Sequence, residues 1–249
     1  MAVEINLENK VALVTGGTRG IGKAIVNELL QSGAKVFATG TNLIQIEKLN
    51  KENKHSLLTY LQLDLSETNN VRKFILKTLK LTEIDILVNN AGINKVSDAD
   101  IISDEEFLQI QDINVHGPFL LAQAFGKQMI NRNWGRIINI SSIWGVVTRP
   151  GRLSYSASKM ALLGISKTLA VEWAKNNVLV NSVSPGFTLT ELTKTTNTKQ
   201  ELKEIENKIP QNRLALPDEI AKGVLFLSSN LNSYIVGQNL IIDGGYTAI

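Results

Sequence analysis

The sequence predicts a doubly wound α/β fold, with a seven-stranded parallel sheet covered by helices on both faces. Short apolar runs rich in Val, Ile and Leu alternate with amphipathic stretches of helical period along the whole chain. Each apolar run is bounded by polar residues or glycines. A glycine-rich turn follows the first run and opens directly into a helical stretch. Together these patterns are typical of parallel strands joined by crossover helices.

Seven apolar runs are the expected strands: Val11–Thr15, Lys35–Thr39, Leu58–Leu63, Asp85–Asn89, Arg136–Ser141, Val178–Ser184 and Asn239–Ile242. Two of the intervening stretches have clear helical spacing. Within Ile21–Gln31, apolar residues recur every four positions, and Tyr155–Lys175 keeps the same period. We therefore expect these two stretches to be crossover helices.

One stretch interrupts this alternation. Thr190–Arg213 is polar and rich in lysine, although Leu202, Ile205 and Ile209 are spaced to line one face of a short helix. We expect residues 190–213 to form a mobile lid over the substrate. No repeat, low-complexity tract or proline-rich linker divides the chain, so residues 1–249 are expected to form a single domain.

The composition excludes several functional classes. The chain has 249 residues, of which 43% are hydrophobic and 20% charged, and no run approaches the roughly 20 apolar residues of a membrane span. Its first ten residues include Glu4, Glu8 and Lys10 and do not resemble a signal peptide. We therefore expect a cytoplasmic protein without a membrane partner.

Residues for metal and thiol chemistry are scarce. Cysteine is absent, which excludes disulfides and thiolate nucleophiles, and the histidines His55 and His116 are far apart. No metal site is expected, and redox chemistry would need a bound cofactor. The net charge is +3, but the lysines are scattered and arginines do not cluster. We expect no nucleic-acid partner, and this modest basicity suits an anionic cofactor or substrate.

The glycine-rich turn is the first candidate binding site. It reads Thr15-Gly16-Gly17-Thr18-Arg19-Gly20-Ile21-Gly22 and joins the first strand to the first helix. Glycines let the backbone approach a pyrophosphate closely, and the free amides of a helix start attract its charge. The alternative is an ordinary structural turn. The residues expected to contact the cofactor here are Gly16, Thr18, Arg19, Gly20, Ile21 and Gly22.

The second strand indicates which nicotinamide cofactor is bound. A free ribose 2′-hydroxyl usually meets an acidic residue there, but this strand ends in Thr39-Gly40-Thr41-Asn42. Without a carboxylate near Thr41, and with Arg19 available to bind a 2′-phosphate, NADP(H) is favoured over NAD(H). The alternative is that Arg19 is a solvent-exposed surface residue that binds no phosphate. After the third strand, Asp64 either caps a turn or bonds the adenine, and Leu65 follows it.

Tyr155 and Lys159 are the candidate catalytic pair. They are four residues apart, so they share one face of a helix and reach the same ligand. A phenol can donate the proton that neutralises charge developing on a carbonyl oxygen. A nearby ammonium would lower its pKa from about 10. By itself, such a pair occurs by chance in many helices.

The pair belongs to an ordered set of motifs. With the glycine turn, Asn89-Asn90-Ala91-Gly92, Asn114, Ser142 and Pro185-Gly186, the chain resembles the classical short-chain dehydrogenase/reductase family along nearly its whole length. The resemblance implies a Rossmann-type fold, an NAD(P)(H) cofactor and a catalytic tetrad of Asn114, Ser142, Tyr155 and Lys159. In it, Tyr155 supplies the proton, Lys159 also holds the nicotinamide ribose, Asn114 supports a proton-relay water and Ser142 orients the carbonyl.

The resemblance also extends the cofactor site. Asn90 and Gly92, with Ala91 between them, are expected on the adenosine-ribose side, while Asn89 ties adjacent strands together. After the sixth strand, the expected cofactor-binding residues are Pro185, Gly186 and Thr188, of which Thr188 would contact the nicotinamide carboxamide.

Within the family, several C-terminal motifs resemble bacterial 3-oxoacyl-acyl-carrier-protein reductases: Ile209-Pro210-Gln211-Asn212-Arg213, Pro217-Asp218-Glu219-Ile220, Val236-Gly237-Gln238 and Asp243-Gly244-Gly245. This resemblance implies NADPH-dependent reduction of 3-oxoacyl thioesters. Recognition of the acidic carrier needs basic residues, yet two expected positions hold Asn133 and Asn176, with Arg132 and Lys175 beside them. The sequence therefore leaves open whether acyl carrier protein is a partner.

Trp144, Arg149 and Arg152 lie between Ser142 and Tyr155, where they either wall the substrate pocket or belong to a structural loop. In a pocket they would suit an anionic substrate, or a sugar stacked on the indole. A sugar or polyol dehydrogenase is thus the second hypothesis, and a cofactor-binding protein without turnover is the third.

The resemblance further implies a homotetramer that packs through the helices carrying Asn114 and Tyr155 and through the C-terminal segment. The expected apolar contact residues are Ala161, Leu162, Leu163 and Ile165.

Overall fold

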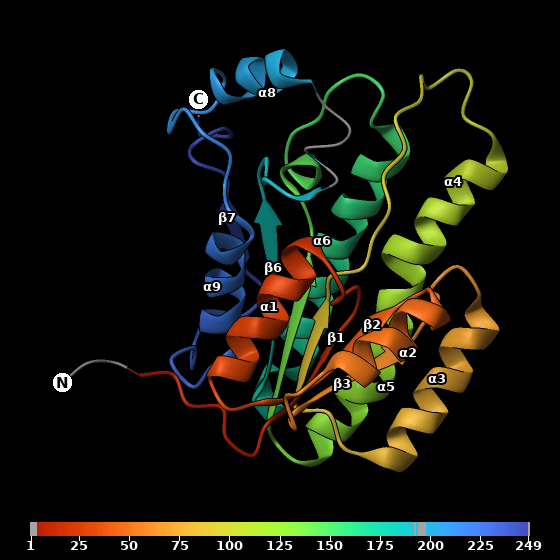
Figure 1. Ribbon diagram of the computed structural model, residues 1–249, viewed down its shortest axis with the longest axis vertical. Helices are drawn as coiled ribbons and strands as arrows, with labels where there is room; N and C mark the ends of the chain where they lie inside the picture. The colour runs from red at the N-terminus through yellow and green to blue at the C-terminus, as the bar shows by residue number, and fades with distance from the viewer. Residues whose placement is uncertain (1–3, 192, 194–197, 249) are drawn as a thin grey trace.

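The computed structural model describes residues 4–191, 193 and 198–248, and these form one parallel sheet with helices on both faces (Figure 1). The seven strands lie in the order β3-β2-β1-β4-β5-β6-β7, and every neighbouring pair is parallel. The order reverses between β1 and β4, where a doubly wound sheet has its ligand crevice. The predicted Rossmann-type sheet is confirmed.

The strand bounds agree with the predicted runs to within one residue at each end. They are β1 Val11–Val14, β2 Lys35–Gly40, β3 Leu58–Gln62, β4 Ile86–Asn89, β5 Gly135–Ile140, β6 Val178–Pro185 and β7 Asn239–Ile242. In β1, side chains alternate between the two faces, yet Ala12, Leu13 and Val14 are all fully buried. Burial on both faces explains why this run is apolar at consecutive positions.

Two hydrophobic cores sandwich the sheet. Ala12 and Val14 pack into the core beneath α1 and α9, whereas Leu13 packs into the core beneath α3, α5 and α6. The helices are α1 Gly20–Gln31, α2 Leu43–Glu52, α3 Thr68–Leu81, α4 Asp104–Gln111, α5 Gly117–Asn131, α6 Leu153–Trp173, α8 Lys199–Glu206 and α9 Pro217–Ser228. The short turns are the π-helix η1 Asp112–His116 and the 3-10 helices η2 Ile143–Gly145 and η3 Ala174–Asn176. The predicted helix Tyr155–Lys175 therefore starts earlier, at Leu153, and its last turn becomes η3.

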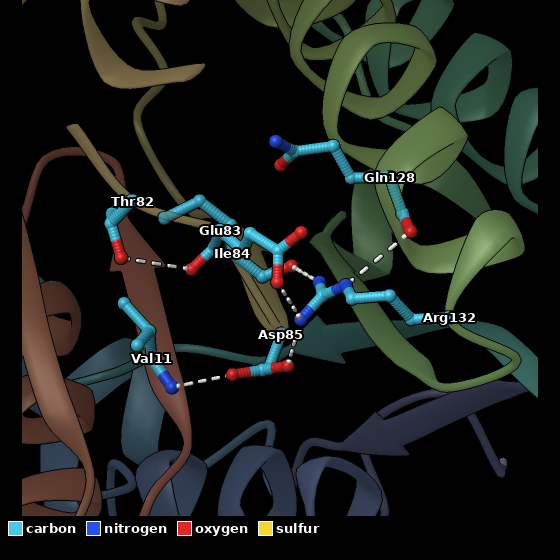
Figure 2. A network of polar contacts seen from close by, with 7 residues as sticks. All are labelled: Val11, Thr82, Glu83, Ile84, Asp85, Gln128 and Arg132. Atoms are coloured by element: carbon cyan, nitrogen blue, oxygen red, sulfur yellow. Dashed lines mark hydrogen bonds and ion pairs between the residues drawn. The ribbon is translucent and has the colours of Figure 1, made fainter. Parts of the chain in front are cut away.

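A polar network holds the amino ends of the central strands to the end of α5 (Figure 2). Asp85 accepts hydrogen bonds from the Val11 amide at 2.9 Å and from Arg132 Nη1 at 2.7 Å. Arg132 Nη2 donates to the Ile84 carbonyl at 2.7 Å, and Glu83 approaches the same guanidinium at 3.4 Å. Arg132 is thus engaged inside the protein rather than free for a partner.

The predicted lid is described only in part, because residues 192 and 194–197 lie outside the described residues. Its helix is α8, which begins with a capping box between Thr198 and Glu201. Figure 1 shows α8 beyond the carboxyl end of β6. Ile209 was expected on the same helical face, but it lies past the helix end, where it is buried beside Gly244.

Helix α6 combines core and surface positions. Leu162 is 1% exposed, so the expectation that it supplies contact surface is wrong, because it packs inside the protomer. Val171 is 84% exposed on the same helix, and nothing lies within 4 Å of a Cβ placed on Gly164. No helix in the described part of the chain has the length and apolar character of a membrane span.

Candidate active site

The carboxyl end of β5 and the first turns of α6 bring three predicted catalytic side chains together. Ser142 directly follows this end of the sheet and hydrogen-bonds the hydroxyl of Tyr155. Lys159, one turn further along α6, donates from Nζ to the Ile140 carbonyl at 2.8 Å. Its Nζ lies 5.5 Å from the centre of the Tyr155 ring. The two titratable groups are therefore neighbours, as their spacing predicts.

Asn114 reaches the same place from the π-helix η1. Its Oδ1 accepts from the Ile93 amide at 2.8 Å, and its Nδ2 donates to the Ile93 carbonyl at 2.9 Å and to Ser158 Oγ at 3.0 Å. Ser158 in turn donates to the Tyr155 carbonyl at 2.7 Å. All hydrogen-bonding atoms of the Asn114 side chain are thus engaged in positioning the backbone around it.

Gly92 separates Asn114 from Lys159. A Cβ at this position would lie 3.1 Å from Asn114 Oδ1 and 3.4 Å from Lys159 Nζ. Only a residue without a side chain leaves this space free. The structure therefore brings the four tetrad residues together around the end of the Asn90–Gly92 segment.

Burial dominates the electrostatics of the pair. It lowers the pKa of Lys159 to about 8. It raises the pKa of Tyr155, against the opposing effects of the Ser142 hydrogen bond and the charge of Arg152. From the sequence we expected Lys159 to lower the pKa of Tyr155, but among the described residues Arg152 is the cation that does so. The protein alone therefore keeps the phenol protonated at neutral pH.

The glycine turn has the shape of a phosphate cradle. Gly16 and Gly20 have φ angles of +64° and +55°, which favour glycine. A Cβ on Gly22 would lie 2.2 Å from the Gly16 carbonyl oxygen, so no larger residue fits there. Arg19, at the N-cap of α1, makes no capping bond with its side chain. The first amides of α1 thus face the crevice without a side-chain cap, as a pyrophosphate requires.

Asn90 braces this turn rather than projecting freely from it. Its Nδ2 donates to the carbonyls of Thr15 at 2.9 Å and Gly16 at 3.2 Å. Thr15 Oγ1 accepts from the amides of Asn90 and Ala91, both at 3.0 Å. The segment after β4 therefore runs from the glycine turn to Gly92, beside Asn114 and Lys159.

The end of β2 fits a 2′-phosphate. Thr39-Gly40-Thr41-Asn42 carries no acid, and Asn42 caps α2 by accepting from the Gln45 amide at 2.9 Å. Arg19 is exposed and makes no ion pair with any residue that the structure describes. Thr18 is partly exposed and Thr41 is exposed, so both side chains can reach a ligand.

The other predicted cofactor residues line the same crevice or support it. Asp64 Oδ1 accepts from the amide and the hydroxyl of Ser66, at 2.9 and 2.7 Å, so it caps a turn. Leu65 is buried against Gly117. Pro185 is the last residue of β6, and the Gly186 amide donates a hydrogen bond to the Ile242 carbonyl in β7. Thr188 is buried, and its hydroxyl donates to the Gly186 carbonyl at 3.1 Å.

Three aromatic rings from separate parts of the chain pack against one another, and one of them belongs to η2, directly after Ser142. Trp144 makes edge-to-face contacts with Phe187 at 5.9 Å and Tyr246 at 6.2 Å, and these two rings lie 5.4 Å apart. Sequence reasoning included Trp144 but missed its two partners. Both follow motifs that it did single out, since Phe187 comes after Pro185-Gly186 and Tyr246 after Asp243-Gly244-Gly245.

The two predicted substrate arginines border this aromatic cluster. The Arg149 guanidinium lies 5.3 Å from the centre of the Trp144 ring. Burial and the charge of Arg149 lower the pKa of Arg152, and Tyr155 raises it. Both arginines therefore lie within electrostatic reach of each other, and Arg152 also acts on the catalytic phenol.

A family model described as enoyl-(acyl carrier protein) reductase matches residues 16–247, which include the glycine turn and all four tetrad residues. The chain belongs to the short-chain dehydrogenase/reductase family. It is accordingly an NAD(P)-dependent oxidoreductase that acts on CH–OH or C=O groups.

Members of this family with different activities are similar to the chain. The 3-oxoacyl-acyl-carrier-protein reductase of Aquifex aeolicus is 40% identical, with 98% of this chain and 99% of that protein covered. An NAD-dependent glycerol dehydrogenase of Listeria innocua is 36% identical, with 98% and 96% covered. The crystal structure of a putative NAD(P)-dependent gluconate 5-dehydrogenase from Beutenbergia cavernae, with bound NADP, superposes with a TM-score of 0.92 at 31% identity, over 98% of this chain and 99% of that one.

Proposed function

We propose that this short-chain dehydrogenase/reductase uses NADP(H) to interconvert a ketone and a secondary alcohol on a small substrate, with Tyr155 as the proton donor and acceptor. One observation carries the proposal: the segment braced against the glycine turn by Asn90 continues to Gly92, which separates Asn114 from Lys159. A nucleotide lying along this segment would end at the catalytic pair.

The cofactor would be held along the whole crevice. The glycine turn suits the pyrophosphate, and Arg19 with Thr41 suits a ribose 2′-phosphate, because no acid is present to repel it. Lys159 and Thr188 suit the nicotinamide end. When bound, the nicotinamide supplies the hydride for ketone reduction or accepts it in the reverse direction. Residues 190–213 are proposed to cover this end of the crevice as a lid.

The residues of the chain provide the proton and the orientation. Reduction adds a hydride to the carbonyl carbon and a proton to its oxygen, and Tyr155 donates that proton from its hydroxyl. Its raised pKa keeps the phenol protonated for this step. Ser142, hydrogen-bonded to the same hydroxyl, fixes the substrate oxygen beside it. The resulting phenolate is reprotonated from solvent along the side of the pocket where Asn114 lies.

The first substrate candidate is a 3-oxoacyl thioester, which is supported by the 40% identical reductase of Aquifex aeolicus. The surface offers little to an acidic carrier protein. Asn176 Nδ2 donates to Asn133 Oδ1 at 3.4 Å, and Arg132 is engaged by Asp85, which leaves Lys175 as an exposed neighbour. This candidate therefore predicts that coenzyme A thioesters are reduced at least as fast as carrier-protein thioesters.

The second candidate is a sugar, polyol or short hydroxy acid. The aromatic cluster of Trp144, Phe187 and Tyr246 favours it, because an aromatic ring at the substrate site would stack on a small polar ligand such as a sugar. The glycerol dehydrogenase of Listeria innocua and the gluconate 5-dehydrogenase structure add support.

The test is a substrate panel with the purified protein. NADPH oxidation is measured with acetoacetyl-coenzyme A and its carrier-protein analogue, and NADP⁺ reduction with glycerol and gluconate, each against Tyr155→Phe. Tyr155-dependent turnover of either group supports the activity and identifies the substrate class. Tight NADPH binding without turnover of any compound would instead support the cofactor-binding protein that the sequence left open.

We further propose that the protein is a homotetramer that packs through α6. On the outer side of this helix Val171 is exposed, Met160 is half-exposed and the position of Gly164 is open, with the exposed Lys167 between Gly164 and Val171. A sizing column coupled to light scattering tests this. Elution at the mass of a tetramer supports it, and a monomer alone contradicts it.

A further inference from the structure

We propose that Arg149 and Arg152 form a subsite for an anionic group, carboxylate or phosphate, of a short substrate. The proposal rests on the oxidoreductase activity proposed above and narrows its substrate class. In this proposal, the two arginines bind a negatively charged group of the substrate that lies only a few carbon atoms from the reacting carbonyl.

The position of Arg152 sets the distance between the anion and the reacting carbon. Arg152 is the residue that precedes α6, and Tyr155 lies three residues later, which places the two side chains on neighbouring positions of the helix surface. Each acts electrostatically on the other, since Arg152 lowers the pKa of Tyr155 and Tyr155 raises that of Arg152. A group bound to Arg152 is therefore close to the oxygen that Tyr155 protonates.

Neither arginine has an acidic partner in the part of the chain that the structure describes. Arg132 pairs with Asp85, and Arg213 pairs with Glu219 through two bonds of 2.7 Å. Burial and the like charge of Arg149 instead lower the pKa of Arg152. The Nε of Arg152 is buried without a hydrogen-bond partner. An anion would supply both the missing charge and the missing acceptor.

The loop that carries the pair is held in place. Thr148 Oγ1 and Ser156 Oγ are 2.9 Å apart, so the start of the loop is fixed to α6. The Ser97 amide donates to the Gly151 carbonyl at 3.3 Å, and Gly151 has a φ of +75° that lets the chain turn there. Such anchoring holds the guanidinium groups near their binding positions before a ligand arrives.

The aromatic cluster limits the length of the ligand. Arg149 lies over the Trp144 ring at 5.3 Å, and Trp144 is closed in by Phe187 and Tyr246. These packed rings would bound one side of the subsite, which favours a compact polar ligand with one charged end. The pair is also separate from Arg19 at the glycine turn, so the anion that it binds is not the pyrophosphate of the cofactor.

Calorimetric titration of the NADP⁺-loaded protein tests the subsite without turnover. The probes are tartrate and its uncharged counterpart erythritol, and glycerol 3-phosphate and glycerol. We expect at least one anion to bind about tenfold or more tightly than its uncharged counterpart. Preference for tartrate identifies a carboxylate ligand, and preference for glycerol 3-phosphate identifies a phosphate. Equal binding of the charged and uncharged members of both pairs, or no binding of either anion, overturns the proposal.

Variants assign the effect to the arginines. Arg152→Gln and Arg149→Gln are each expected to weaken binding of the preferred anion about tenfold or more, and Arg152→Lys to recover part of the loss. Arg72→Gln, at an exposed arginine of α3, is the matched control and should bind like the parent. Unchanged anion affinity in Arg152→Gln contradicts the subsite. If the protein reduces thioesters through Tyr155, and if Arg152→Gln does not alter that rate, the subsite proposal is wrong. The proposed oxidoreductase activity would still hold.

Discussion

Replacing Lys159 with methionine should make the protein more stable at neutral pH while abolishing its activity. Burial lowers the pKa of this lysine from 10.5 to about 8, so the folded protein holds the charge in unfavourable surroundings. At about 1.4 kcal/mol for each tenfold change in a protonation equilibrium, the cost is about 3 kcal/mol. Methionine removes this cost but loses the hydrogen bond to the Ile140 carbonyl, which is worth about 1 kcal/mol. The expected net gain is about 2 kcal/mol.

The gain should depend on pH in a defined direction. The unfolded chain keeps the lysine proton up to about pH 10.5, whereas the folded chain releases it near pH 8. Between these values the unfolded state binds more protons, so the wild-type protein gains stability as pH rises. The advantage of Lys159→Met is therefore complete below pH 8 and disappears between pH 8 and pH 10.5.

Urea unfolding at pH 7 and pH 10, without added nucleotide, measures this difference. Lys167→Met, at an exposed lysine on the same helix, is the control and should change stability little at either pH. The reasoning would be refuted if Lys159→Met were less stable than wild type at pH 7. A difference that stayed constant between the two pH values would refute it as well.

Three further predictions concern the cofactor site and the base of the sheet. Gly22→Ala places a Cβ 2.2 Å from the Gly16 carbonyl and should weaken NADPH binding more than tenfold in a fluorescence titration; wild-type affinity would contradict the cradle. Thr41→Asp adds the absent carboxylate, so the ratio of kcat/KM for NADPH over NADH should fall about tenfold or more, and an unchanged ratio would count against the assigned 2′-phosphate site. Asp85→Asn weakens the hold on Arg132 and should lower the free energy of unfolding by about 1–3 kcal/mol in urea, without changing kcat. If kcat fell together with the free energy of unfolding, this prediction would be wrong, because the network would then affect the active site.

The fold was predictable because burial on both faces leaves a strong signal. The run Val11–Thr15 is apolar at every position but its last, and the ends of the predicted runs differ from the observed strands by at most one residue. The spacing of Tyr155 and Lys159 also predicted their proximity, because a helix fixes the relative positions of residues four apart. Local geometry was sufficient in both cases.

Features that depend on contacts between distant segments could not be predicted. Trp144, Phe187 and Tyr246 come from three separate parts of the chain, and no local pattern indicates that they meet. The pKa of Tyr155 depends on burial, on the Ser142 hydrogen bond and on Arg152, whereas the sequence led us to expect effects of Lys159 and of the oxidised nicotinamide.

The proton-donor role of Tyr155 is the central claim, and a comparison of wild type with Tyr155→Phe tests it most directly. For the best substrate of the panel, the rate of NADPH oxidation at saturating substrate and the dissociation constant of NADPH are measured for both proteins. The account predicts that the rate falls by about 10²–10⁴-fold, while the dissociation constant changes less than about threefold. A phenylalanine variant that retained most of the wild-type rate would contradict it.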